Sequence, residues 1–323
     1  MKINGDYPVR SDAKVNKMNP LSDIALFEGN QTKDPNVFPQ TLAVNDYFIQ
    51  EPRYLQAYAN YFAKFITAYG EEGIPISTVM FQNESWSYTN YPGCAWTPEG
   101  IVRFNTEYLA PTLKRTHPEV QVYLGTINTN RYDIIDCVLS DSRMPQTIKG
   151  VGFQWEGGQI LPRLRSKFPN YKYVQTEGEC GWGSFDWKAA EHTFERINHY
   201  LGNGCEDYTF WNAILADNGI SGWGWKQNAL IRVDSKRHTF VYTPEYYAVK
   251  HYSHFIAEGT EIVAWKGQKE DKLPVLIVKL KAKKYAVMAG NFNGNNKDIS
   301  IGINGKYLNV TLPAHSLNTF IMK

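Results

Sequence analysis

The alternation of helix-like and strand-like segments between residues 52 and 215 is the feature that most constrains the fold. Residues 51–73 place apolar side chains three and four positions apart, the helical period, and Gly70 and Gly73 close this segment. The predicted strands are short β-branched or aromatic runs at 74–86, 120–126, 148–155, 172–178 and 207–215, with helix-like segments between them. This alternation predicts a parallel sheet covered by helices. We therefore predict an α/β fold with five countable barrel strands.

The pattern changes after about residue 259. Short alternating segments follow one another there, separated by turn sequences such as "NGNNK" and "NGK". This indicates antiparallel strands in a small β-sandwich. We predict a (β/α) barrel domain over 1–258 and a β-sandwich domain over 259–323. The first 50 residues show no sustained periodicity and are expected to form a long loop.

Charge and composition exclude several classes of function. The formal net charge is only +2 and no block of like charges appears, so neither nucleic acid nor an anionic membrane is an expected partner. The four cysteines lack metal-ligand spacing and are expected to be buried thiols. No apolar run is long enough to span a membrane, and the first residues lack the apolar core of a signal peptide. The aromatic content of 14% fits either sugar stacking or a large aromatic core, and composition does not decide between them.

Polar residues stand at the ends of the predicted barrel strands, where α/β barrels carry their catalytic groups. They are Asn83, Glu84, Gln154, Glu177 and Asn212. An ionised carboxylate at the end of a buried strand costs several kcal/mol or more unless it is paired or used. Two carboxyl groups, one protonated and one ionised, are the minimum equipment for glycoside hydrolysis. The sequence therefore predicts a sugar-cleaving site built around Glu84 and Glu177.

Four separated motifs resemble glycoside hydrolase family 30, which includes glucosylceramidases and β-1,6-glucanases. They are "FQNESWSYTNYPGCAWTPEGIVRFNTEYLAPTLK", "VQTEGECGWGSFDW", "YTFWNAIL" and "TPEYYAVKHYSHFIAEGTEIV". The resemblance implies a retaining (β/α)8 TIM-type barrel with an attached β-sandwich. It makes Glu84 the acid/base and Glu177 the nucleophile, and it leaves Glu179 as the spare carboxylate. It also implies that no metal or organic cofactor is needed.

Further contacts to the sugar are expected from nearby polar and aromatic side chains. Asn83 and Asn212 are candidates for bonds to sugar hydroxyls, and Trp211 for the floor of the sugar site. The other predicted substrate-binding residues are Tyr91, Trp96, Gln154 and Trp155. Trp223 and Trp225 are further stacking candidates, although each of these loop aromatics fits packing within a loop equally well.

Three departures from the family pattern qualify the resemblance. Ser85 stands where the family commonly has proline, which is expected to alter the loop more than the chemistry. Gln154 stands where glucosylceramidases carry histidine, which favours the bacterial glucanase-like branch. Family members also carry a sandwich strand and three barrel strands before the segment that resembles "MKINGDYPVR", so the barrel of this chain is expected to lack its N-terminal strands.

The expected function is therefore that of a retaining β-glucosidase or endo-glucanase acting on a β-glucan or β-glucoside by double displacement. The alternative is a truncated, catalytically impaired relic that still binds glucan. The full-length protein is expected to be secreted or periplasmic, although this chain shows no signal peptide. The sequence leaves linkage specificity and oligomeric state open.

Overall fold

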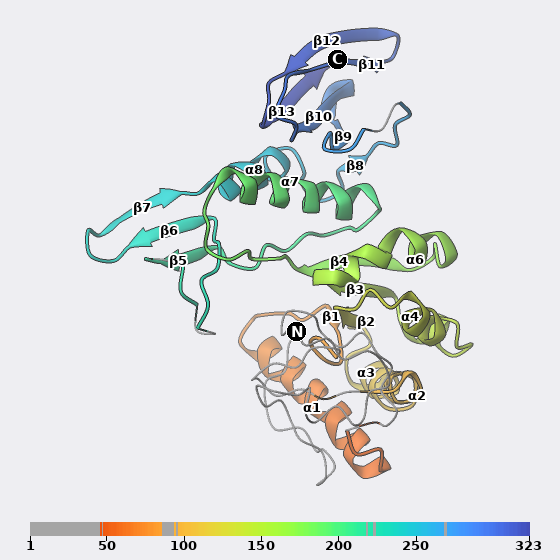
Figure 1. Cartoon of the computed structure of the whole chain (residues 1–323). Coiled ribbons are helices and arrows are strands. Elements are labelled where there is room, and N and C mark those ends of the chain that lie inside the picture. Colours follow the sequence, from red (N-terminus) through yellow and green to blue (C-terminus); the bar gives the residue numbers. More distant parts are fainter. Residues whose placement is uncertain are drawn as a thin grey trace. The chain divides into compact units, whose positions relative to one another are not determined.

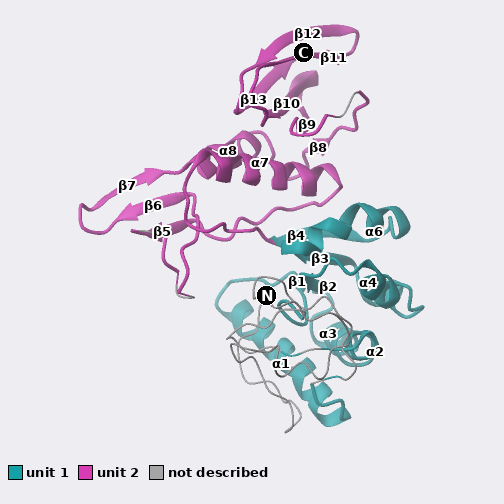
Figure 2. Cartoon of the chain, in the orientation of Figure 1, with its two compact units in different colours: residues 1–176 teal, residues 177–323 magenta. Residues whose placement is uncertain are grey.

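The computed structural model describes residues 46, 48–85, 94, 96–217, 219–221, 224–267 and 270–323. The chain divides into two compact units, residues 1–176 and 177–323, which Figure 2 shows in teal and magenta. The long loop predicted for the first 50 residues lies almost entirely outside the described residues.

Strands and helices alternate in unit 1 as the sequence predicts (Figure 1). The strands form one sheet in the order β1-β2-β3-β4, and β2 pairs in parallel with both β1 and β3. The elements are, in chain order, α1 (Pro52–Glu71), β1 (Thr78–Val79), α2 (Pro98–Arg103), the π-helical turn η2 (Phe104–Leu109), α3 (Ala110–Thr116), β2 (Gln121–Ile127), α4 (Tyr132–Leu139), α5 (Met144–Thr147), β3 (Gly150–Gln154), the 3-10 helix η3 (Trp155–Ile160), α6 (Leu161–Lys167) and β4 (Lys172–Glu177).

Helix α1 shows how the predicted periodicity becomes a packed face. Leu55, Tyr58, Phe62 and Ile66 lie on one stripe of the helix and are buried. Pro52 stands in the first turn, where its missing N–H leaves no partner unsatisfied. The ring of Tyr58 stacks in the aromatic core of unit 1, and its hydroxyl donates to the carbonyl oxygen of Phe81 at 2.6 Å. The helix is thereby fixed to the segment that follows β1.

The described parallel sheet has four strands, and most of the segment 207–215, predicted as a fifth strand, is not a regular strand. Only Ile214–Ala216 is a strand in that segment (β5), and it pairs with β6 of a separate sheet. The backbone bonds explain this, because Leu230 and Ile231 donate to the carbonyls of Asn212 and Ala213 and draw the segment toward β6. The strand predicted over 74–86 is also shorter than expected, since β1 holds two residues.

Unit 2 combines two long helices with antiparallel strands. Its sheets have the orders β13-β10-β9-β8, β11-β12 and β5-β6-β7. The elements are, in chain order, α7 (Trp187–Gly202), β5 (Ile214–Ala216), β6 (Ile231–Asp234), β7 (Thr239–Tyr242), α8 (Pro244–Ser253), β8 (Glu261–Ile262), β9 (Val275–Leu280), the 3-10 turn η4 (Lys281–Lys283), β10 (Lys284–Asn291), β11 (Lys297–Ile303), β12 (Lys306–Leu312) and β13 (Ser316–Met322).

The four-stranded sheet of unit 2 is covered on both faces. Side chains alternate between the faces of a strand, and in β9 this sends Leu276 and Val278 into a core shared with α7 and α8. Ile277 points the other way, into a cluster with Ile301 of β11 and Leu308 of β12. The second cluster lies between two antiparallel sheets, as the predicted β-sandwich requires.

The division into compact units differs from the predicted domain boundary at 258/259. Helices α7 and α8 pack against each other and against the four-stranded sheet, so they group with the sandwich strands. The boundary at 258/259 stays a prediction about domains. None of the helices that the structure describes has the length and apolar character needed to cross a membrane.

Candidate active site

Glu84 lies in the segment that follows β1 and is buried. Its φ is +47°, a left-handed backbone conformation that is uncommon for a residue with a side chain. The Glu84 N–H donates to Oγ1 of Thr126, at the end of β2, at 3.0 Å. Unusual backbone conformations of this kind persist where surrounding contacts fix them, and they are frequent at functional sites.

Gln154, the last residue of β3, directs its side-chain amide at Glu84. Its Nε2 donates to Glu84 Oε1 at 2.5 Å and to Asn83 Oδ1 at 3.2 Å. Its Oε1 accepts from Oγ1 of Thr176 in β4 at 3.3 Å, and this contact sets which end of the amide faces Glu84. Residues from three neighbouring strands therefore hold one carboxyl group.

The sequence analysis identified Asn83, Glu84 and Gln154 as site residues but missed Thr126 and Thr176. Each of these threonines is the second-last residue of its strand, and this position could have identified them.

Trp96 is packed in the aromatic core of unit 1. Only 2% of the residue is exposed, and its ring stacks on Phe48 with centroids 4.8 Å apart. The indole N–H donates to Gln82 Oε1 at 2.8 Å. Both the ring and the N–H of Trp96 are thus engaged inside the unit, and packing accounts for its position. Tyr91 and Trp223 lie outside the described residues.

Glu177 is the last residue of β4 and is buried. The Gly178 N–H beside it donates to the carbonyl oxygen of Thr209 at 2.8 Å, which ties the end of the strand to the segment that follows α7. A glutamate that ends a parallel strand has the placement of a catalytic group in an α/β barrel.

Glu179, the neighbouring carboxylate, is paired with helix α7. His192 Nε2 lies 2.7 Å from Glu179 Oε2. Burial acts to raise the pKa of Glu179, but the bond and charge of His192 and the charge of Arg196 outweigh it, so that the pKa is lowered. This partner gives Glu179 a structural reason to be ionised.

The remaining predicted residues lie in different settings. Asn212 donates through Nδ2 to Gln227 Oε1 at 3.0 Å and to the carbonyl oxygen of Asn228 at 3.1 Å, and so holds a loop of unit 2. The ring of Trp211 contacts that of Trp225 edge to face, with centroids 6.1 Å apart. Trp155 begins η3 directly after Gln154 and has a φ of +47°.

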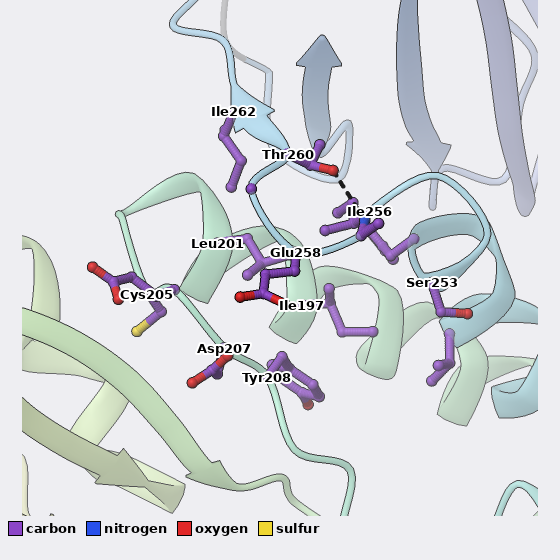
Figure 3. A pocket seen from close by; sticks show the side chains of 15 residues that line it. Ile197, Leu201, Cys205, Asp207, Tyr208, Ser253, Ile256, Glu258, Thr260 and Ile262 are labelled. Atoms are coloured by element: carbon purple, nitrogen blue, oxygen red, sulfur yellow. Dashed lines mark hydrogen bonds between the residues drawn. The ribbon is translucent and has the colours of Figure 1, made fainter. Parts of the chain in front are cut away.

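Unit 2 also contains an open pocket of about 890 Å³ at the C-terminal ends of α7 and α8 (Figure 3). Its apolar wall includes Leu201 and Ile256, and its rim includes Asp207 and Glu258. None of the predicted site residues lines it, so it is not the candidate active site. The part of the chain that the structure describes holds no cluster of side chains suited to a metal ion.

Residues 48–256 match the family model for the glycosyl hydrolase family 30 TIM-barrel domain. The chain belongs to this family. Its parallel strands are thus strands of a TIM-type barrel, and the antiparallel sheets after them are consistent with a β-sandwich domain. The family is one of glycosidases.

Known proteins similar to this chain differ in substrate. The lysosomal acid glucosylceramidase of Mus musculus is 26% identical over 296 residues, which cover 83% of this chain and 56% of the mouse protein. The endo-β1,6-glucanase BT3312 superposes with a TM-score of 0.74 at 20% identity, over 87% of this chain and 64% of that chain. The subfamily 8 xylanase Xyn30A of Clostridium acetobutylicum superposes with a TM-score of 0.67 at 20% identity, over 84% and 72%. The chain spans about half the length of the curated relatives it matches.

Proposed function

We propose that this chain carries the catalytic residues of a retaining glycoside hydrolase that cleaves β-glucosidic bonds. Glu84 is the acid/base and Glu177 the nucleophile. The observation that carries the proposal is that side chains at the ends of strands fix Glu84 in an unusual backbone conformation. Thr126 accepts from its backbone N–H, and Gln154 donates to its carboxyl oxygen. The similarity to glucosylceramidases and to a β1,6-glucanase supports glucose as the cleaved sugar.

The contact with Gln154 orients the acid. An amide N–H can only donate, so Glu84 Oε1 accepts this bond, and a carbonyl oxygen accepts better than the hydroxyl oxygen of the acid. The proton to be transferred therefore belongs on Oε2. A general acid needs one oxygen fixed in this way so that the other meets the leaving group.

The reaction then follows two displacements. Glu84 donates its proton to the glycosidic oxygen while Glu177 attacks the anomeric carbon, which breaks the glycosidic bond and forms a glycosyl ester. The ionised Glu84 next takes a proton from water, whose oxygen attacks the same carbon. The ester bond breaks, Glu177 returns as a carboxylate, and the sugar leaves with its β configuration.

Trapping of the ester tests this proposal. The intact mass of the chain is measured after incubation with an activated 2-fluoro-β-glucoside, followed by peptide mapping. We expect one added sugar on Glu177, no label in the Glu177→Gln variant and an unchanged label position in Glu179→Gln. Label on Glu179, or equal turnover by Glu177→Gln and the parent chain, would contradict the assignment. Binding of glucan without any label would favour the glucan-binding relic.

A further inference from the structure

Three tryptophans of unit 2 form a continuous row of ring contacts. The rings of Trp182 and Trp225 lie with centroids 6.3 Å apart and planes inclined by 44°, and Trp225 in turn meets Trp211 at 6.1 Å. Trp182 is 70% exposed, whereas the other two are partly buried. Packing does not use the outer face of this ring, so the end of the row is open to a ligand.

The loop that carries Trp182 is fixed by buried polar groups. Asn228 donates its N–H to the carbonyl oxygen of Cys180 at 2.6 Å, and the Gly183 N–H donates to Asn228 Oδ1 at 2.6 Å. Gly181 has a φ of +59°, and a Cβ there would lie 2.9 Å from Asn228 Oδ1, so the turn needs glycine. The backbone on both sides of Trp182 is therefore held in place.

Asn228 is itself anchored by helix α8. Its Nδ2 donates to Oε1 of Glu245 in the first turn of α8, and both residues are buried. Since Trp225 stands three residues before Asn228, one asparagine organises both loops that supply the aromatic rings. A ring on a rigid loop loses little conformational freedom when it binds a ligand.

We propose that Trp182 and Trp225, which continue the row from Trp211, the predicted floor of the sugar site, form an aromatic platform that binds a further sugar residue of the substrate, beyond the one that bonds to Glu177. The proposal rests on the proposed function and narrows its substrate to an oligosaccharide or glucan. Trp182 stands five residues after Glu177, a stretch that spans at most about 18 Å. A short oligosaccharide bound at Glu177 is therefore long enough to reach Trp182.

The surroundings of the platform favour a sugar over an acyl chain. A sugar ring offers a C–H face for the indole and hydroxyl groups for polar neighbours at the edge. The exposed residues beside Trp182 and Trp225 in the chain are Ser184, Gly224 and Lys226, which are polar or glycine. Ser184 and Lys226 offer a hydroxyl and an ammonium group that can bond to sugar hydroxyls, which an acyl chain would leave unused.

Binding of β-1,6-linked glucotriose to the full chain carrying Glu177→Gln, measured by calorimetry, tests the platform. Adding Trp182→Ala is expected to weaken binding about three- to tenfold, the effect of one lost stacking contact. Trp187→Ala is the matched control, because Trp187 is a 39% exposed tryptophan of the same unit whose ring contacts no described aromatic. It is expected to leave binding unchanged.

The outcomes separate this inference from the proposed function. If the parent chain never forms the glycosyl ester but binds the triose through Trp182, the platform stands and the catalytic proposal fails. If the ester forms but Trp182→Ala binds the triose as tightly as its parent, or no triose binds, the platform is overturned. Loss of octyl β-glucoside binding in Trp182→Ala, with triose binding intact, assigns the platform to an alkyl chain and also overturns it.

Discussion

The side-chain amide of Gln154 donates to Glu84 Oε1 across 2.5 Å, from the last residue of β3 to the segment that follows β1. Both side chains are buried, so this bond is not shared with bulk solvent. Hydrogen bonds to carboxylates are shorter and about twice as strong as those between neutral groups. Gln154 therefore orients the proposed acid/base without reacting itself, and it is a positioning residue.

Replacing Gln154 with leucine is expected to lower kcat/KM on an aryl β-glucoside by about 10-fold or more. The amide stabilises the negative charge that develops on Glu84 as its proton leaves, and a bond to a charged group contributes about 1.5–3 kcal/mol. Thr176→Val, which removes only the hydroxyl that orients the amide, is expected to have a smaller effect in the same direction. Gln56→Leu is the control, since Gln56 donates to Thr112 elsewhere in unit 1. Equal activity of Gln154→Leu and the parent chain would show that Gln154 does not act on Glu84.

The lowered pKa of Glu179 predicts a stability effect that depends on pH. A carboxyl group whose folded pKa lies below its ordinary value of 4.5 adds stability above that value and loses it as the pH falls through the lowered pKa. Glu179→Gln is therefore expected to lower Tm at pH 7 by about 2 °C, the scale of a partly exposed pair, and this difference in Tm is expected to shrink as the pH is lowered below 4.5. Glu261→Gln, which breaks the exposed pair with Lys279, is expected to change Tm little at either pH. If Glu179→Gln lowered Tm by the same amount at every pH, the ion pair would be excluded as the cause of that change.

The sequence predicted most helices and strands because their periodicities are long and regular, as in α1 and α7. It placed Asn83, Glu84 and Gln154 together because parallel strands present their ends at one edge of a sheet. It could not show that residues 207–215 hold only the short strand β5 at their end, since that depends on backbone bonds to Leu230 and Ile231. Nor could it separate Trp96, a packing residue, from Trp182, an exposed one, because residue type does not reveal which side of a loop faces the core.

Glu245 is expected to destabilise the folded chain as the pH rises. Burial raises its pKa, partly offset by the bond from Asn228, and its Oε2 has no hydrogen-bond partner among the described residues. An acid with a raised folded pKa binds more protons when folded, so stability falls as the pH increases above its ordinary value of 4.5.

The neutral variant Glu245→Gln keeps the acceptor for Asn228 and is expected to raise Tm at pH 7.5 while leaving it unchanged at pH 4. Glu245→Ala removes that acceptor and is expected to lower Tm at both values. Thermal unfolding of the three chains at the two pH values measures this. A lower Tm for Glu245→Gln at pH 7.5 would mean that the ionised carboxylate is favoured at this position.

Trp96 provides a test of packing against substrate binding. Removing a buried aromatic side chain costs about 3–5 kcal/mol, so Trp96→Ala is expected to unfold at a much lower denaturant concentration or to fail to fold.

The milder variant Trp96→Phe keeps most of the ring contacts with Phe48 and Phe81. It loses the hydrogen bond from the indole N–H to Gln82. It is expected to cost about 1–3 kcal/mol, since the acceptor stays buried without that donor. Because the ring packs inside unit 1, KM for an aryl β-glucoside is expected to stay unchanged in Trp96→Phe. A raised KM together with parent-like stability would instead place Trp96 at the sugar.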